Sequence, residues 1–415
     1  MERPAGSDRL ASLDIVRGVA VLGILLLNIL SFAMPEAAYF NPRAYGGWHG
    51  ADLATWAANF VLFDGKMRGL FSFLFGASTL LVIERAEAGG LSPAEVHYRR
   101  MAWLLVFGIA HLFLVWHGDI LAHYALVGMI AFAMRDMPVS RLIILGILLG
   151  LAGAVLFATI PLGIVAAMGR DSNPQALHDY SLMFGAPNAA DIARELALHR
   201  GGYGPILLDR LQHDSGALTG QLIFFGPETL AYMLFGMAAL RSGMLRGEWA
   251  PARYRRWLVA CWSIALPAYA LLAWWQWASG FDIRVVAAMM PLTALARPPM
   301  IAGWICLILL LARPGGRLTA RLAAAGRMAF TNYLVTSLIC TTLFYGYGLG
   351  WYGHLSRWQL YPVVFGIWAA ILTWSSLWLH AFRFGPFEWL WRSLARWELQ
   401  PLRNTSLRNN ATASQ

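Results

Sequence analysis

The segment "GIAHLFLVWHGDILAHYALVG", residues 108–128, places three histidines and an aspartate among side chains suited to lipid. His111, His117, Asp119 and His123 are separated by Leu, Phe, Val, Trp and Ile. Apolar residues on both sides of Gly118-Asp119 predict two membrane helices joined by a turn. The polar side chains belong either to a water-facing turn or to a functional site. The remaining sequence helps to distinguish these two interpretations.

The composition of the whole chain indicates a membrane protein. Its 415 residues are 58% hydrophobic and 13% charged and include 19 Trp, whereas a soluble protein is roughly one quarter charged. The apolar runs of roughly 20 residues are continuous rather than alternating, as in transmembrane helices and not in barrels. We therefore expect an all-α, polytopic transmembrane helical bundle.

The apolar runs divide the chain into ten expected spans within a single transmembrane domain, residues 1–398. Segment 51–64 is predicted to be a helix at the membrane surface, and 399–415 a flexible cytoplasmic tail. The outer loop, 166–218, either caps an outer opening or is simply a loop with short helices. The expected spans are 17–34, 67–84, 100–117, 119–135, 141–165, 219–241, 256–278, 286–312, 325–348 and 359–382.

The basic residues predict the orientation of the bundle. The formal net charge is +10, and 31 of the 32 basic residues are Arg, clustered between apolar runs. With the N-terminus inside, 22 of the 32 lie on the cytoplasmic side, and short cytoplasmic loops are enriched in such residues. Both termini are therefore expected in the cytoplasm. The same pattern suits anionic headgroups, so the expected partner is the lipid bilayer and not nucleic acid.

Polar residues inside the spans converge at one depth. Counting residues at about 1.5 Å each places Asn28, Lys66, His111 and Glu228 in the outer half of the membrane, and Asp119 in the turn above. Polar groups at such depth usually face the interior of the bundle. Arg68, beside Lys66, and His123, one turn below Asp119, lie at a similar depth. We therefore predict that these polar groups line one chamber, which is either a reaction site or a translocation site.

Each member of this set also has a simpler interpretation. Lys66 and its neighbour Arg68 can extend to the headgroups, Asp119 can cap the next helix, and Glu228 can form an ion pair with either cation. His117 and His123 flank the turn and are expected to be wet, which leaves His111 alone inside the membrane. No metal site is expected, because the histidine spacing across a turn does not bring three ligands to one point.

A second polar set is predicted at the cytoplasmic face. It contains Arg17, Arg327, Arg383 and Arg392. Guanidinium groups bind phosphate through two parallel hydrogen bonds, so the set suits a nucleotide-like group. The alternative is that these arginines only anchor the protein at the cytoplasmic surface, with Asp14 as a partner of Arg17.

Several of these motifs resemble the YeiB family of bacterial inner-membrane proteins, also called domain of unknown function 418. The resemblance extends over nearly the whole chain. It rests on six ordered stretches: "SLDIVRGVAVLGILLLNI", "FDGKMRGLFSFLFGAS", "GIAHLFLVWHGDILAHYALVG", "GPETLAYMLFGMAALRSG", "GRMAFTNYLVTSLI" and "RFGPFEWLWR". The resemblance implies a multi-pass protein of the bacterial cytoplasmic membrane.

That family is similar to transmembrane acyltransferases, including heparan-α-glucosaminide N-acetyltransferase. The similarity implies an acyl-CoA donor from the cytoplasm, no permanently bound cofactor, and a small-molecule or glycan acceptor at the outer face. It matches Arg17 and Asn28 to an Arg and an Asn eleven residues apart in the first helix of those relatives. A neutral His111 would be the base, with Asn28, Lys66 and Asp119 assisting.

Other functions stay open at this stage. The chamber also suits a transporter or exporter of a small polar metabolite, although no repeated halves are evident in the sequence. A membrane scaffold without catalysis is a third interpretation. A homodimer is compatible with the sequence, which does not determine the oligomeric state.

Overall fold

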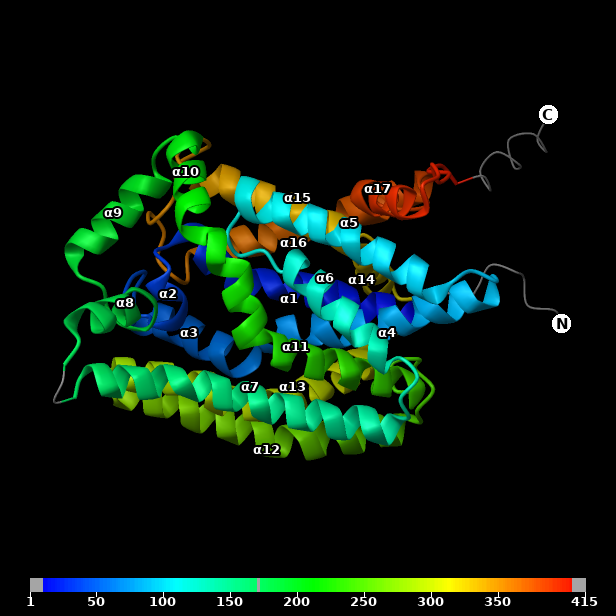
Figure 1. The fold of residues 1–415 in the computed structure, drawn as a ribbon, viewed down its shortest axis with the longest axis horizontal. Coiled ribbons are helices and arrows are strands. Elements are labelled where there is room, and N and C mark those ends of the chain that lie inside the picture. Colours follow the sequence, from blue (N-terminus) through cyan, green and yellow to red (C-terminus); the bar gives the residue numbers. More distant parts are fainter. Residues whose placement is uncertain (1–9, 170–171, 405–415) are drawn as a thin grey trace.

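The computed structural model describes residues 10–169 and 172–404, and this part of the chain is helical throughout (Figure 1). The long helices are α1 (Ala11–Ala33), α4 (Lys66–Ala88), α5 (Pro93–Leu114), α7 (Val139–Ala167), α11 (Ala217–Arg241), α12 (Pro251–Ala278), α13 (Ile283–Leu311) and α16 (Leu360–Ala381). The shorter ones are α2 (Ala37–Phe40), α3 (Gly50–Leu62), α6 (Leu121–Ala131), α8 (Pro174–Phe184), α9 (Ala189–His199), α10 (Tyr203–His213), α14 (Arg317–Arg327), α15 (Ala329–Phe344) and α17 (Pro386–Arg396).

The expected all-helical membrane class is confirmed. In the described residues, seven segments are long and apolar enough to cross a membrane: α1, Gly50–Ala88, α7, α11, α12, α13 and α16. Two further apolar helices, Leu121–Met134 and Ala329–Phe344, are shorter. The remaining expected span falls on α5, whose first two turns carry Glu95, Arg99 and Arg100. The number of ten spans stays a prediction.

Helix α1 lies at the centre of the bundle because it is apolar around its whole circumference. It contacts α4, α14, α15 and α16, and most of its residues are buried. Gly18 permits a close contact with α14, since a Cβ atom there would lie 2.0 Å from the carbonyl oxygen of Leu322.

Helices α7 and α12 lie at the periphery and turn large apolar side chains outward. Val155 is 69% exposed, and Ile264 is 72% exposed. These two helices pack on α13, and α7 also packs on α11 (Figure 1). An outward surface of this kind is expected of helices that face lipid.

The bundle has two unlike ends. Helices α8, α9 and α10 gather at one end, and the beginning of α1 lies with α17 at the opposite end (Figure 1). Following the predicted orientation, we call the α8–α10 end outer and the other end inner. The outer loop predicted at 166–218 thus contains three short helices. It also packs onto the bundle, because the Tyr203 hydroxyl donates to the carbonyl of Leu114 at the end of α5 (2.7 Å).

Two shorter segments make contacts that their composition did not predict. Helix α3, predicted to lie at the surface, buries Trp56 against Phe281 and packs on α12. The predicted flexible tail is docked at its start: the N–H of Arg383 donates to Leu402 (2.8 Å), and the N–H of Asn404 donates to Ala381 (3.1 Å). Backbone pairing of this kind was not visible in the polar composition of 399–404. Residues 405–415 lie outside the described part of the chain.

The crossing of α4 and α11 generates a stability prediction. A Cβ atom on Gly236 would lie 1.8 Å from the carbonyl oxygen of Phe73, a contact that only movement of the backbone relieves. We expect Gly236→Leu to destabilise the protein by about 3 kcal/mol or more, the upper part of the range for overpacked cores. Thermal unfolding in detergent measures this effect. Gly366→Leu is the control, because nothing lies within 4 Å of its Cβ position, and equal melting temperatures for the two variants would contradict the proposed crossing.

Candidate functional site

The turn between α5 and α6 lies inside the bundle. Helix α6 has only 11 residues, which span about 16 Å, whereas a bilayer core is about 30 Å thick. The turn is covered from the outer end by α10, where Arg210 donates to the carbonyl of Phe113 (3.4 Å). The shortness of α6 therefore places Asp119 below the outer surface, and the carboxylate is 2% exposed rather than wet.

His111 and Asp119 form a buried pair across this turn. His111 Nδ1 lies 2.9 Å from Asp119 Oδ1, and the other carboxylate oxygen accepts the N–H of Ala122 (2.8 Å). Asp119 thus both caps α6 and holds the histidine. A carboxylate only accepts hydrogen bonds, so Nδ1 donates to Asp119. In the neutral ring, Nε2 then presents a lone pair. His111 Nε2 is buried and has no hydrogen-bond partner among the described residues.

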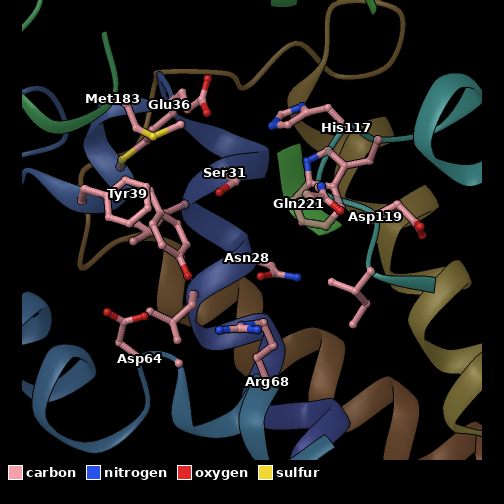
Figure 2. Close-up of a pocket in the computed structure, with 18 of the residues that line it drawn as sticks. Asn28, Ser31, Glu36, Tyr39, Asp64, Arg68, His117, Asp119, Met183 and Gln221 are labelled. Atoms are coloured by element: carbon pink, nitrogen blue, oxygen red, sulfur yellow. The ribbon is translucent and has the colours of Figure 1, made fainter. Parts of the chain in front are cut away.

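A cavity of about 590 Å³ opens beneath the outer helices. Asn28 of α1 and Arg68 of α4 project into its middle, while Asp64 lies on one wall and His117 on the other (Figure 2). We call this space the outer cavity. Its polar lining also includes Ser31, Glu36, Tyr39, Asp119, His123, Glu195, Arg210, Gln221, Thr293 and Arg297.

Of the residues predicted to converge on one chamber, Asn28, Arg68, Asp119 and His123 line this cavity. His111 is bonded to Asp119 but is not itself among the residues that line the cavity. His123 was expected to be wet, yet it is 4% exposed because its ring nitrogen Nε2 lies 2.9 Å from the Thr229 hydroxyl on α11.

Glu228 is an anchor for two arginines. Its carboxylate forms ion pairs with Arg68 (2.5 Å) and with Arg297, and it accepts a hydrogen bond from Tyr232 (2.8 Å). Glu228 is 1% exposed and lies behind the two arginines that line the cavity. Glu228 was predicted to line the chamber, but it lies behind the lining residues. Both of its carboxylate oxygens are already bound to Arg68, Arg297 and Tyr232.

Lys66 faces away from the outer cavity, contrary to the prediction. Its ammonium donates to the carbonyl of Phe60 (2.5 Å) and lies 3.2 Å from the centre of the Tyr269 ring. The side chain is 0% exposed. The physical reason is helix geometry: with 3.6 residues per turn, residues two apart are about 200° apart around the axis. Lys66 and Arg68 of α4 therefore point in different directions.

A second cavity, of about 830 Å³, opens toward the inner end. Its volume is in the range of small-molecule and cofactor sites. Of the described residues that line it, the arginines are Arg17, Arg85, Arg100, Arg327 and Arg392. We call this space the inner cavity. Its deeper walls are apolar and include Ile24, Phe71, Leu74, Phe75 and Leu104.

Three of the four arginines predicted to bind a phosphate group thus share one cavity. Arg17 also contacts Asp14 (3.0 Å) and Ser78 (2.8 Å). Arg383 is not among the lining residues, because its backbone pairs with Leu402 at the surface of the inner end. Arg100 was counted in the sequence only as an anchor, but it lines the cavity with its guanidinium over the Trp391 ring (4.2 Å).

The two cavities approach each other at the α5–α6 turn. Ile120, next to Asp119, lines both of them. Tyr333 of α15 lines the inner cavity, and its ring centre is 5.2 Å from that of His111. The His111–Asp119 pair therefore lies at the partition between a polar outer space and an arginine-rich inner space.

The outer rim is fixed by α9. Glu195 accepts hydrogen bonds from the N–H of Glu36 (2.8 Å) and from the Tyr352 hydroxyl (3.0 Å), and burial raises the pKa of Glu195. Burial also lowers the pKa of His199, which stacks on Tyr352, to about 4. His199 is therefore neutral at physiological pH, and it contributes no charge to the cavity roof.

Sequence reasoning missed Arg297, which lies inside the apolar α13. The signal was present, because an ionisable residue within a span is expensive and usually functional. What the sequence did not contain was the partner, since Glu228 lies 69 residues away.

The Glu228 cluster generates the second prediction. Glu228→Gln removes the charge that neutralises two buried guanidinium groups, and breaking a buried ion pair costs about 3–5 kcal/mol. We expect a clear fall in melting temperature in detergent. Glu84→Gln is the matched control, because Glu84 is 47% exposed in its pair with Arg246, and exposed pairs contribute about 0–1 kcal/mol. Similar shifts for the two variants would show that Glu228 is not an anchor.

Comparison with known proteins agrees with this architecture. A family model described as "Protein of unknown function (DUF418)" matches residues 239–398. The chain is 36% identical to the uncharacterized protein YeiB of Escherichia coli, covering 93% of this chain and 96% of that protein. It is 32% identical to the uncharacterized protein YxaH of Bacillus subtilis, covering 95% and 96%. With relatives matched over nearly their full length, the chain belongs to the DUF418 family of multi-pass membrane proteins.

Proposed function

We propose that this protein is a membrane acyltransferase that moves an acyl group from a cytoplasmic acyl-CoA to an acceptor at the outer face. The observation that carries the proposal is the His111–Asp119 pair, which holds a proton-accepting nitrogen at the partition between two cavities. The proposal includes ten spans with both termini in the cytoplasm of a bacterial inner membrane. The described ends of the chain, which lie together at the inner end (Figure 1), support that topology.

The inner cavity suits the donor. Arginines at its mouth offer paired N–H groups to the phosphates of CoA, and the apolar walls beyond them accommodate the pantetheine arm and acyl chain. Arg17, Arg327 and Arg392 are the proposed phosphate ligands, joined by Arg100.

His111 is the proposed base. Asp119 orients its imidazole so that Nε2 removes the proton from the acceptor hydroxyl or amine. The acceptor then forms a bond to the thioester carbon, the carbon–sulfur bond breaks, and the imidazolium returns its proton to the CoA sulfur. His111 Nε2 is buried in this structure, so the reaction includes a movement of Ile120 that joins the cavities.

The outer cavity suits a polar acceptor, either a small molecule or a glycan. Asn28 and Arg68 project into it and present hydrogen-bond donors (Figure 2). In this proposal Asn28 orients the acceptor, and Glu228 keeps Arg68 in place.

The base generates the third prediction. In nanodiscs with acetyl-CoA or longer acyl-CoAs, and hydroxylamine as a small acceptor, we expect His111→Ala to reduce kcat for CoA release by about 10²–10⁴-fold, the usual contribution of general base catalysis. Mass spectrometry of released CoA and of the hydroxamate measures the rate. His354→Ala controls for loss of an exposed histidine.

The outcomes separate acyl transfer from transport, two of the three functions that the sequence left open. Full activity of His111→Ala would remove His111 from the mechanism. Neither binding nor cleavage of any acyl-CoA by the wild-type protein would contradict acyl transfer and favour a transporter or exporter of a polar metabolite.

The donor site generates the fourth prediction. Arg392→Gln removes a charge-assisted hydrogen bond to phosphate, worth about 1.5–3 kcal/mol, so we expect the Kd for CoA to rise about 10- to 100-fold. Arg396→Gln, one turn further along α17 and not among the residues that line the cavity, is the matched control. Calorimetric titration with CoA measures both, and equal Kd values would place the CoA phosphates elsewhere.

A further inference from the structure

Tyr333 lies at the inner side of the partition, and no role has yet been given to it. It is in the second turn of α15, which begins at Ala329 after a break in the helix at Met328. Tyr333 is buried (8% exposed) and lines the inner cavity. Of the inner-cavity residues, it is the one whose ring contacts His111.

The hydroxyl of Tyr333 has an uncommitted proton. It accepts the N–H of Ile120 at 3.4 Å, and no acceptor for its own proton is recorded among the described residues. Tyr124 in the same cavity differs, because its hydroxyl bonds to the Ser72 hydroxyl (2.8 Å) and donates to the carbonyl of Arg68 (3.1 Å). A tyrosine hydroxyl both donates and accepts, so Tyr333 retains a donor for a ligand in the inner cavity.

We propose that Tyr333 is a catalytic residue whose hydroxyl donates a hydrogen bond to the thioester carbonyl oxygen and stabilises the oxyanion formed during transfer. This inference rests on the proposed acyl transfer. One observation supports it. The Tyr333 hydroxyl has a proton without an acceptor among the described residues, lies at the inner cavity where acyl-CoA is proposed to bind, and is next to His111. Such donors stabilise charge that develops in the transition state, where low polarity strengthens them.

The acyl transfer passes through a tetrahedral oxyanion. As the acceptor bonds to the carbonyl carbon, its proton passes to His111 Nε2, and the carbonyl electron pair moves to the oxygen. The Tyr333 hydroxyl donates to that oxyanion without losing its proton. When the carbonyl re-forms, the carbon–sulfur bond breaks, and the CoA thiolate takes the proton from His111.

Tyr333→Phe tests the proposal in the full-length protein in nanodiscs, with acyl-CoA and hydroxylamine as above. Removing one oxyanion donor typically costs about 10²–10³ in kcat, so we expect that loss with the Kd for CoA unchanged. Tyr254→Phe is the control, because this buried residue lines neither cavity and its hydroxyl donates to the carbonyl of Met244 (2.6 Å). We expect that variant to lose stability and keep its kcat.

A second variant separates the hydroxyl from the shape of the ring. Fluorotyrosine incorporated at position 333 retains the donor, and we expect a kcat within tenfold of wild type. A kcat of Tyr333→Phe within threefold of wild type would overturn the inference and leave acyl transfer intact. The inference would also be overturned if Tyr333→Phe weakened CoA binding as much as it lowered kcat. It would be overturned as well if the fluorotyrosine protein lost as much kcat as Tyr333→Phe. Wild-type protein that cleaves no thioester would instead overturn the acyl transfer itself.

Discussion

A carboxylate buried in a membrane bundle must be paired, because the bilayer offers no water to solvate it. Two buried carboxylates, Asp119 and Glu228, meet this requirement by bonding to residues on neighbouring helices. Asp119 joins α5 to α6 by bonding both His111 and the N–H of Ala122. Glu228 joins α11 to α4 and α13 by pairing with Arg68 and Arg297. Together they allow a polar cavity to exist at a depth where lone polar groups are costly.

The same condition explains why the site lies at a partition. Helix α6 is too short to cross a bilayer, so the turn between α5 and α6 lies inside the bundle. This turn brings His111 and Asp119 to the level where the inner cavity ends. Ile120 lines both cavities, and Tyr333 approaches from α15 on the inner side. In the proposed function, two reactants bound from opposite faces come near each other at this partition.

Much of the fold was predictable from periodicity and charge. The apolar runs predicted the helices, and the two-sided arginine pattern predicted an inner end that holds the arginine-rich cavity. The site was predictable only in part, because depth along a helix can be counted from the sequence but direction around its axis cannot. Lys66 shows this: it lies at the start of α4, yet it points to Tyr269 rather than into the cavity.

The sequence by itself determined the membrane class, the helical segments and the position of each polar residue along its helix, since each follows from local composition and a fixed rise per residue. Only the tertiary structure decided which polar residues share a cavity and which are pairing partners. Glu228 and Arg297 are 69 residues apart, and Tyr333 and Ile120 are 213 apart. Contacts over such separations depend on how helices rotate and cross, and that is set by close packing at glycines such as Gly18 and Gly236.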